Sequence, residues 1–336
     1  MLQRKTVLSL FAGAALTIGA VSTLTANASE TVVMNIGWAT PLDSDYGILA
    51  KKFEELAESY TNGGVDVKLR CCAQIATEDD AFKALQLGTV DAYFISQNNI
   101  SPHWPLMDVF VLPYIFQSGE HLVKVASGPV GDKIRAKLQA DTGVYLLTFG
   151  GPGYRDMFNS KRPINSIEDL KGLKMRVPKN EVMLATFEAF GAEPVPLAWS
   201  ETPTALQTGT IDGGDNGTSV IREMKFFEFA KNLVILDHFA GFAPVLASDR
   251  FMSRLSDDKR AAVLKAAAEA GAYHTKIKLA EIEGIRNWLS TEGGMKVTRP
   301  DRTEFIKAAQ TVQQDFAKKR GQEFTDLVNA IQAAAD

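Results

Sequence analysis

Cysteine is scarce in this chain of 336 residues, since its only two cysteines are the neighbours Cys71 and Cys72. This scarcity excludes the framework of several disulfides on which small secreted domains depend. The four histidines show no ligand spacing with the two cysteines, so no metal site is predicted. The pair itself leaves two hypotheses open, because it can hold two free buried thiols or a strained disulfide between neighbours.

A net positive charge and, beyond the N-terminal segment, long apolar runs are lacking as well. The formal net charge is −4, and such mild acidity argues against nucleic acid or an anionic membrane surface as a partner. After residue 28, no segment of the sequence is long and apolar enough to cross a bilayer. These properties predict a soluble protein that binds neither nucleic acid nor membrane.

The motifs of common catalysts are also missing from the sequence. It contains no Gly-x-Ser-x-Gly, no His-Glu-x-x-His and no Cys-x-x-Cys. Single His, Ser and Asp residues occur, as in any chain of this length, but no spacing connects them. We therefore predict no catalytic residue, no cofactor and no enzymatic activity.

The N-terminus has the pattern of a secretory signal peptide over residues 1–28. Arg4 and Lys5 precede an apolar run at residues 7–21, and Ala-Asn-Ala at residues 26–28 fits a cleavage site. An uncleaved membrane anchor is the alternative, but the run is short for a span and contains two glycines. Cleavage would remove both cations, take the formal net charge from −4 to −6, and predict a mature protein in the periplasm.

An eight-residue pattern occurs twice in the chain, and the second copy begins 121 positions after the first. Residues 84–91 are Ala-Leu-Gln-Leu-Gly-Thr-Val-Asp, and residues 205–212 are Ala-Leu-Gln-Thr-Gly-Thr-Ile-Asp. The pattern is typical of a helix that ends on a left-handed glycine and is followed by a strand starting at Thr-Val or Thr-Ile. The copies are too far apart for a solenoid, so we predict two similar α/β lobes.

Strand-like and helix-like segments alternate along the mature chain, which indicates the α/β class. The helical spacing of Leu49, Phe53 and Leu56, for example, predicts the first helix. Strands are predicted at residues 32–37, 65–69, 90–95, 144–149, 173–177 and 242–247, the last of which returns to the first lobe. Helices are predicted at residues 46–60, 79–87, 123–140, 181–190 and 201–207, with one or two more over residues 301–335.

Two segments are predicted to join the lobes. Residues 150–153, Gly-Gly-Pro-Gly, are interpreted as a hinge, since they match neither of the common phosphate-loop motifs. From Ser256, a candidate N-cap, a helical pattern runs to about residue 289 without the apolar heptads of a coiled coil. A helix of this length fits one that spans both lobes. An exported, two-lobed protein without a catalytic motif suggests a clamp that closes around a small molecule.

Several motifs carry a resemblance to a known family. They are Asp-Leu-Lys-Gly-Leu-Lys-Met-Arg within residues 163–178, Leu-Gln-Thr-Gly-Thr-Ile-Asp-Gly within 205–216, Ala-Trp-Ser-Glu at 198–201, Leu-Pro-Tyr at 112–114 and Met-Lys-Phe at 224–226. Together they resemble the solute-binding proteins of tripartite ATP-independent periplasmic (TRAP) transporters, the dicarboxylate-binding (DctP-type) family. The resemblance covers essentially the whole mature chain.

The resemblance implies a two-lobe periplasmic-binding-protein fold, type II-like, with hinge strands and a long helix that spans both lobes. Lobe I would hold residues 29–152 and about 242–281, and lobe II residues 153–241 and about 282–336. It also implies a small organic acid as ligand, TRAP permease subunits in the membrane as partners, and a mainly monomeric protein. A ligand-sensing partner of a receptor, or an exported enzyme on the same fold, remains an alternative.

Three residues of the second lobe are implied as ligand contacts. Arg176 matches the family's main carboxylate-binding arginine, whose planar guanidinium can donate two parallel hydrogen bonds, and a solvated strand-end arginine is the alternative. Arg155 resembles a second family arginine, although it can instead pair with Asp156 at the surface. Asn216 matches a family asparagine that both donates and accepts, and its alternative role is to form a turn.

The other candidates lie nearer the first lobe or are aromatic. Glu78 matches an acidic position that contacts polar ligands in some members, or it is only a favourable charge at a helix start. Sialic-acid-binding members have Glu and Arg where this chain has Ser96 and Asn99, so sialic acid is not expected, and both residues remain polar candidates. The aromatic candidates, each with a position in the core as its alternative, are Trp38, Tyr154, Trp199 and Phe239.

Overall fold

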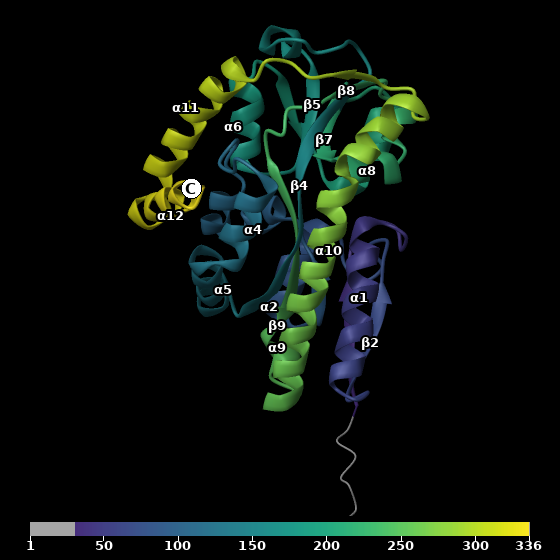
Figure 1. Ribbon diagram of the computed structural model, residues 1–336, viewed down its shortest axis with the longest axis vertical. Helices are drawn as coiled ribbons and strands as arrows, with labels where there is room; N and C mark the ends of the chain where they lie inside the picture. The colour runs from purple at the N-terminus through teal and green to yellow at the C-terminus, as the bar shows by residue number, and fades with distance from the viewer. Residues whose placement is uncertain (1–30, 336) are drawn as a thin grey trace, which may run out of the picture. The chain divides into compact units, whose positions relative to one another are not determined.

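The computed structural model describes residues 31–335 (Figure 1), and its ten strands belong to one sheet. The order is β2-β1-β3-β9-β4-β7-β5-β6, with β8 on β4 and β10 on β8. The predicted signal peptide lies outside the described residues. Within them, no helix has both the length and the apolar character that a membrane span requires.

The first lobe contains the strands of this order from β2 to the first part of β4. Met34 and Ile36 of β1, which matches the first predicted strand, are fully buried. The parallel pairs β2–β1 and β1–β3 are followed by β9, which runs antiparallel to both β3 and β4. The strands are β1 (Val32–Gly37), β2 (Val65–Arg70), β3 (Ala92–Phe94), β9 (Ala240–Ser248) and the first part of β4 (Val144–Asn159).

Helices cover both faces of the first-lobe sheet. Figure 1 shows α1 (Asp45–Tyr60) on one side of β4, beside α10, and α4 and α5 on the other side. The predicted helix over residues 123–140 is divided in two at Gly128 and Pro129, because proline has no N–H to donate within a helix and starts a new one instead. The other elements are α2 (Glu78–Leu87), α3 (Gln97–Ile100), η1 (Pro105–Phe110), α4 (Gly119–Ser127), α5 (Pro129–Thr142) and α9 (Asp249–Met252).

The second lobe is built on the other half of the strand order. Its strands are β5 (Lys174–Val177), β6 (Glu193–Pro196), β7 (Gly213–Gly217), β8 (Asn232–Val234), β10 (Lys296–Thr298) and the last part of β4. Its helical elements are η2 (Ile167–Leu170), α6 (Glu181–Ala189), η3 (Trp199–Glu201), α7 (Thr202–Gln207), α8 (Thr218–Glu223) and η4 (Phe226–Glu228). These are α/β elements like those of the first lobe, so the predicted fold class is confirmed.

Strand β4 passes from one half of the sheet to the other. Its first part pairs with β9, and its last residues, from Arg155 on, pair with β7. The prediction of a strand that stops at residue 149 was wrong, because the Gly-Gly-Pro-Gly segment stays within the strand. The segment coincides with an irregular register between Gly150 and Gly153, where Gly241 of β9 lies opposite Gly153. A strand with this local irregularity connects the lobes directly.

The long helix α10 (Asp257–Thr291) contacts both lobes over its 35 residues. Ser256 is its N-cap and accepts a hydrogen bond from the Lys259 N–H, as predicted. In the first lobe a side chain at Gly271 would place its Cβ 2.3 Å from Thr148 Oγ1, so only glycine permits this close approach. In the second lobe Arg286 donates to Asp156 Oδ1 at 2.7 Å.

The two copies of the repeat occupy equivalent places in the two lobes. Gly88 and Gly209 are left-handed, with φ of 66° and 73°. The strands start one residue after the aspartates, later than predicted, because each carboxylate accepts a backbone N–H from a neighbouring strand. Asp91 Oδ2 accepts from the Asn35 N–H and Asp212 Oδ2 from the Lys174 N–H, each at 2.9 Å. The repeat therefore has a structural origin.

Two helices, α11 (Thr303–Arg320) and α12 (Gln322–Ala333), close the described chain. Helix α11 packs against α6 of the second lobe, whereas α12 also contacts η1 and α5 of the first. The exact lobe boundaries therefore stay a prediction. Cys71 and Cys72 are free thiols, and Cys72 is exposed rather than buried.

Candidate functional site

A cavity lies between elements of the two lobes. From the first lobe it is lined by residues of the α1 and α2 starts and of the β3–α3 region, and from the second by β4, β5, β7 and α8. Seven of the ten predicted ligand residues line it. Its lining residues are Thr40, Tyr46, Glu78, Ser96, Asn98, Asn99, Arg155, Arg176, Pro178, Trp199, Asn216 and Val220.

Arg176 is a buried cation near the end of β5. Its Nε and Nη2 donate to the Leu197 carbonyl at 3.1 and 2.8 Å, and its guanidinium lies 5.7 Å from the centre of the Trp199 ring. Only 3% of the residue is exposed, and no described carboxylate lies within 4.0 Å of it. Burial, together with the nearby Arg155, lowers the pKa of Arg176 to about 10. An unpaired buried charge is costly, so this position favours an anionic ligand.

Arg155 has a protein partner of its own. Its Nε donates to Asp215 Oδ2 at 2.6 Å, and its Nη2 to Asp215 Oδ1 and to the Asp215 carbonyl, at 3.1 and 2.6 Å. Burial by itself raises the pKa of Asp215, but Arg155 and His238 hold that pKa well below its usual range. The pairing of Arg155 with Asp156 that the sequence left open is not found, since Asp156 pairs with Arg286. The charge of Arg155 is thus largely compensated within the protein.

Asn216 is oriented by its neighbours rather than by a turn of its own. Its Oδ1 accepts from the Gly217 N–H at 2.8 Å and faces Arg155 Nη1 at 3.4 Å. Because Oδ1 already accepts these hydrogen bonds, Nδ2 is the group of this side chain that remains as a donor. The residue lies in β7, opposite Asp156 of β4, which explains why it is held at the cavity wall.

Glu78 and Ser96 form the acidic side of the cavity. Glu78 Oε1 accepts a hydrogen bond from the Ser96 N–H at 2.8 Å and another from the Ser96 hydroxyl. Glu78 also lies in the first turn of α2, where its negative charge interacts favourably with the helix dipole. It therefore has a role at the helix start as well as in the cavity wall. Asn99 accepts from Asn98 and presents a further amide nearby. The cavity therefore has a cation on one lobe and hydrogen-bond acceptors on the other.

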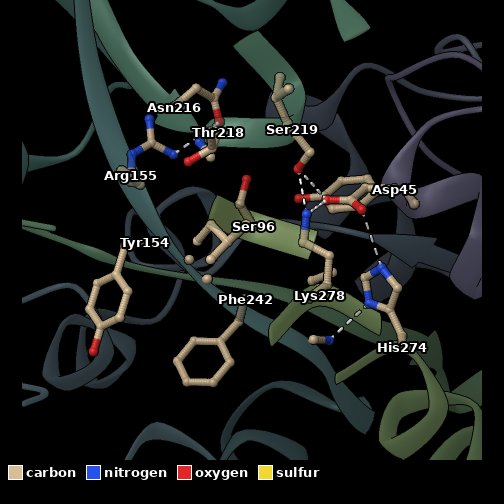
Figure 2. A pocket seen from close by; sticks show the side chains of 18 of the residues that line it. Asp45, Ser96, Tyr154, Arg155, Asn216, Thr218, Ser219, Phe242, His274 and Lys278 are labelled. Carbon is tan, nitrogen blue, oxygen red and sulfur yellow. Dashed lines mark hydrogen bonds and ion pairs between the residues drawn. The ribbon is translucent and has the colours of Figure 1, made fainter. Parts of the chain in front are cut away.

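Tyr154 lines an adjoining chamber instead of the cavity around Arg176. This chamber shares Ser96, Arg155 and Asn216 with that cavity and continues toward Phe242 and the polar residues of α10 (Figure 2). The Tyr154 hydroxyl is buried and has no hydrogen-bond partner among the described residues. Burial and nearby carboxylates raise its pKa to about 12.

Two predicted aromatic contacts lie in the core instead of the cavity wall. Trp38 is fully buried, donates from Nε1 to the Pro41 carbonyl at 3.2 Å, and packs edge-on against Phe94. Phe239 is 1% exposed and packs against His238, with 4.7 Å between ring centres. The structure therefore gives both residues the core position that the sequence had left as the alternative.

Some residues of the site were missed by the sequence analysis. Tyr46 lines both cavities, and Asp215 and His238 stand behind Arg155, with 3.3 Å between His238 Nε2 and Asp215 Oδ2. The only signal for these residues in the sequence was Asp215, the acid directly before Asn216. Within the described chain, no group of three or more His, Cys, Asp or Glu side chains could hold a metal ion.

Known proteins and one family model match this chain along most of its length. Residues 36–320 match the family described as bacterial extracellular solute-binding protein, family 7 (DctP). The chain is 33% identical to the C4-dicarboxylate-binding periplasmic protein DctP of Rhodobacter capsulatus, over 91% of this chain and 92% of that protein. It is 29% identical to the 2,3-diketo-L-gulonate-binding periplasmic protein YiaO of Escherichia coli, over 94% and 96%.

A solved structure has the same fold. A TRAP periplasmic solute-binding protein from a Polaromonas species, bound to D-erythronate, matches with a TM-score of 0.85 and 31% sequence identity. The match covers 90% of this chain and 98% of that chain. The two-lobe arrangement described above is therefore shared along nearly the whole described sequence.

Proposed function

This chain belongs to the bacterial extracellular solute-binding proteins of family 7, and from this premise we propose that it captures a hydroxylated monocarboxylate, such as a sugar acid, between its lobes. The observation that carries the proposal is Arg176, a buried guanidinium without a carboxylate partner among the described residues. A ligand carboxylate would supply the missing charge through charge-assisted hydrogen bonds. Asn216 Nδ2 is available as a further donor.

The charges of the cavity favour one carboxylate over two. Arg155 is compensated by Asp215, so Arg176 and Glu78 are the remaining opposite charges at the wall. A second ligand carboxylate would approach Glu78 and be repelled, whereas a hydroxyl could donate to it. Similar proteins fit this preference, since one is bound to D-erythronate and another is named for 2,3-diketo-L-gulonate. Another relative, however, is named for C4-dicarboxylates, so the choice requires a direct test.

Isothermal titration calorimetry with a matched panel tests the proposal. The panel contains D-erythronate, D-galactonate and D-glucuronate, with succinate as the dicarboxylate and D-galactose as the uncharged control. We expect at least one hydroxylated monocarboxylate to bind at least tenfold more tightly than succinate, and no binding of D-galactose. Tighter binding of succinate would contradict the preference for one carboxylate. Equal binding of galactose and its acid would contradict the role of Arg176.

The captured acid is proposed to pass to the membrane permease subunits of a TRAP transporter, from a mature protein located in the periplasm. Support comes from the periplasmic names of the similar proteins and from the TRAP protein of matching fold. The expected first residue after export is Ser29, which N-terminal sequencing of the secreted protein would establish.

A further inference from the structure

A cluster of polar side chains joins three elements beside the ligand cavity. Figure 2 shows Asp45 at the start of α1, Ser219 on α8, and His274 and Lys278 on α10. Asp45 Oδ2 accepts from the Ser219 hydroxyl at 2.6 Å, and Lys278 donates to both residues. These contacts connect α1 of the first lobe with α8 of the second, so they form only where the lobes meet.

Glu223, at the end of α8, completes this cluster. Its Oε1 accepts a hydrogen bond from the Asp45 backbone N–H at 3.0 Å. Its Oε2 is buried and has no hydrogen-bond partner among the described residues. An ionised carboxylate in such a place lacks the hydration that it would have in water, whereas a protonated carboxyl is neutral and costs less to bury.

The charges of the cluster do not balance if Glu223 is ionised. Lys278 is the cation that pairs directly with Asp45. His274 does not add a second cation in this geometry, because its Nδ1 accepts the Gly151 N–H at 2.9 Å and so holds no proton. Its Nε2 lies 3.6 Å from Asp45 Oδ1. Two carboxylates would then share one ammonium group.

The other charged groups around Glu223 do not bring its pKa back to the ordinary value of a glutamate. Burial, followed by the charge of Asp45, raises the pKa of Glu223 to about 7, although Lys278 and Arg222 act in the opposite direction. For Asp45 itself, burial raises the pKa, but the charge of Lys278 outweighs this effect and the pKa lies well below its usual range. Glu223 is therefore the member of the cluster that is suited to take up a proton near neutral pH.

We propose that the lobes close with the uptake of one proton at Glu223, so that ligand capture is linked to pH. This inference rests on the proposed function, because it assumes that capture brings α8 against α1. When the lobes separate, Glu223 loses Asp45 and gains water, and its pKa returns toward the ordinary value. A group whose pKa is higher in the closed form favours that form as the pH falls. Ligand affinity should therefore rise from pH 8 to pH 5.5.

Calorimetry with D-erythronate, or with the panel acid that binds most tightly, measures this linkage directly. The binding enthalpy is compared between buffers of different ionisation enthalpy, which gives the number of protons taken up. We expect close to one proton at pH 6 and almost none above pH 8, with affinity on the order of tenfold higher at pH 5.5 than at pH 8. The ligand carboxylate is ionised throughout this range, so it contributes no proton.

Two variants separate Glu223 from other groups that titrate. Glu223→Gln keeps the Oε1 acceptor for Asp45 and removes the titration, so proton uptake and the pH dependence should be lost while binding remains. Glu228→Gln, an exposed carboxyl on η4, is the matched control and should behave as the original protein. The inference is overturned if Glu223→Gln takes up the same proton, or if binding is independent of pH. The absence of binding by any panel acid at any pH would refute the proposed function as well.

Discussion

At the scale of single residues, the two arginines of the cavity have different tasks. Arg155 is held by a buried bidentate pair with Asp215, so its position is fixed and its charge is compensated. Arg176 has only a carbonyl partner, which orients the guanidinium without neutralising it. The residue that is short of a counter-ion is the one expected to contribute most to anion binding.

Replacement of Arg176 tests this difference. Arg176→Ala should lower the affinity for the best panel acid at least a hundredfold, equivalent to about 3 kcal/mol, because the ligand carboxylate would be buried without a partner. Lys174→Ala removes a cation from the same strand at an exposed position and should leave affinity unchanged. Calorimetry on both variants decides the point, and near-normal binding by Arg176→Ala would refute the assignment.

At the scale of elements, the repeat positions strands rather than ligands. Each copy ends a helix on a left-handed glycine and then uses an aspartate to bind a backbone N–H of a neighbouring strand. The second copy leads into β7, where Asn216 lines the cavity. The first copy leads into β3, whose three residues are all buried. Polar cavity residues follow β3 only at Ser96, so the repeat itself is structural and the residues that line the cavity come after it in both lobes.

The two aspartates provide a matched pair of variants. Asp91→Ala and Asp212→Ala should each lower the free energy of unfolding by about 1.5–3 kcal/mol, because each removes a hydrogen bond to a charged acceptor. Ligand affinity should stay the same in both. Urea denaturation and calorimetry provide the two measurements, and a selective loss of binding in Asp212→Ala would contradict a purely structural role.

At the scale of the whole described chain, continuous segments of backbone run from one lobe to the other. Strand β4 continues from one half of the sheet into the other, and β9 pairs with it up to Ala240. Helix α10 contacts both lobes. The glycines near residue 150 coincide with the irregular register of β4, where the backbone has fewer restraints from side chains. Such an arrangement suits a hinge in which short segments absorb the change in backbone angles.

Small-angle X-ray scattering tests the hinge. A saturating panel acid should lower the radius of gyration of the protein, because closure brings the lobes together around the ligand. Arg176→Ala at the same acid concentration serves as the control and should not compact, since its sites remain largely empty. Identical scattering curves with and without a ligand that calorimetry shows to be bound would contradict closure.

The sequence by itself determined those features that depend on neighbouring residues. Left-handed glycines at the helix ends, the Ser256 N-cap and the first strand and helix were predicted close to their observed positions. Periodicity and capping are local, because they reflect the backbone geometry of a few adjacent residues. The family motifs added the prediction of a two-lobe fold and identified Arg176 as a candidate ligand contact.

Only the tertiary structure decided which candidates line the cavity between the lobes. It placed Trp38 and Phe239 in the core, and it paired Arg155 with Asp215, which is 60 residues away, instead of with its neighbour Asp156. The register between β4 and β7 makes that pairing, and register depends on contacts between distant segments. The cluster around Glu223 likewise joins three elements whose proximity no local pattern encodes, since burial and charge compensation exist only once the chain has folded.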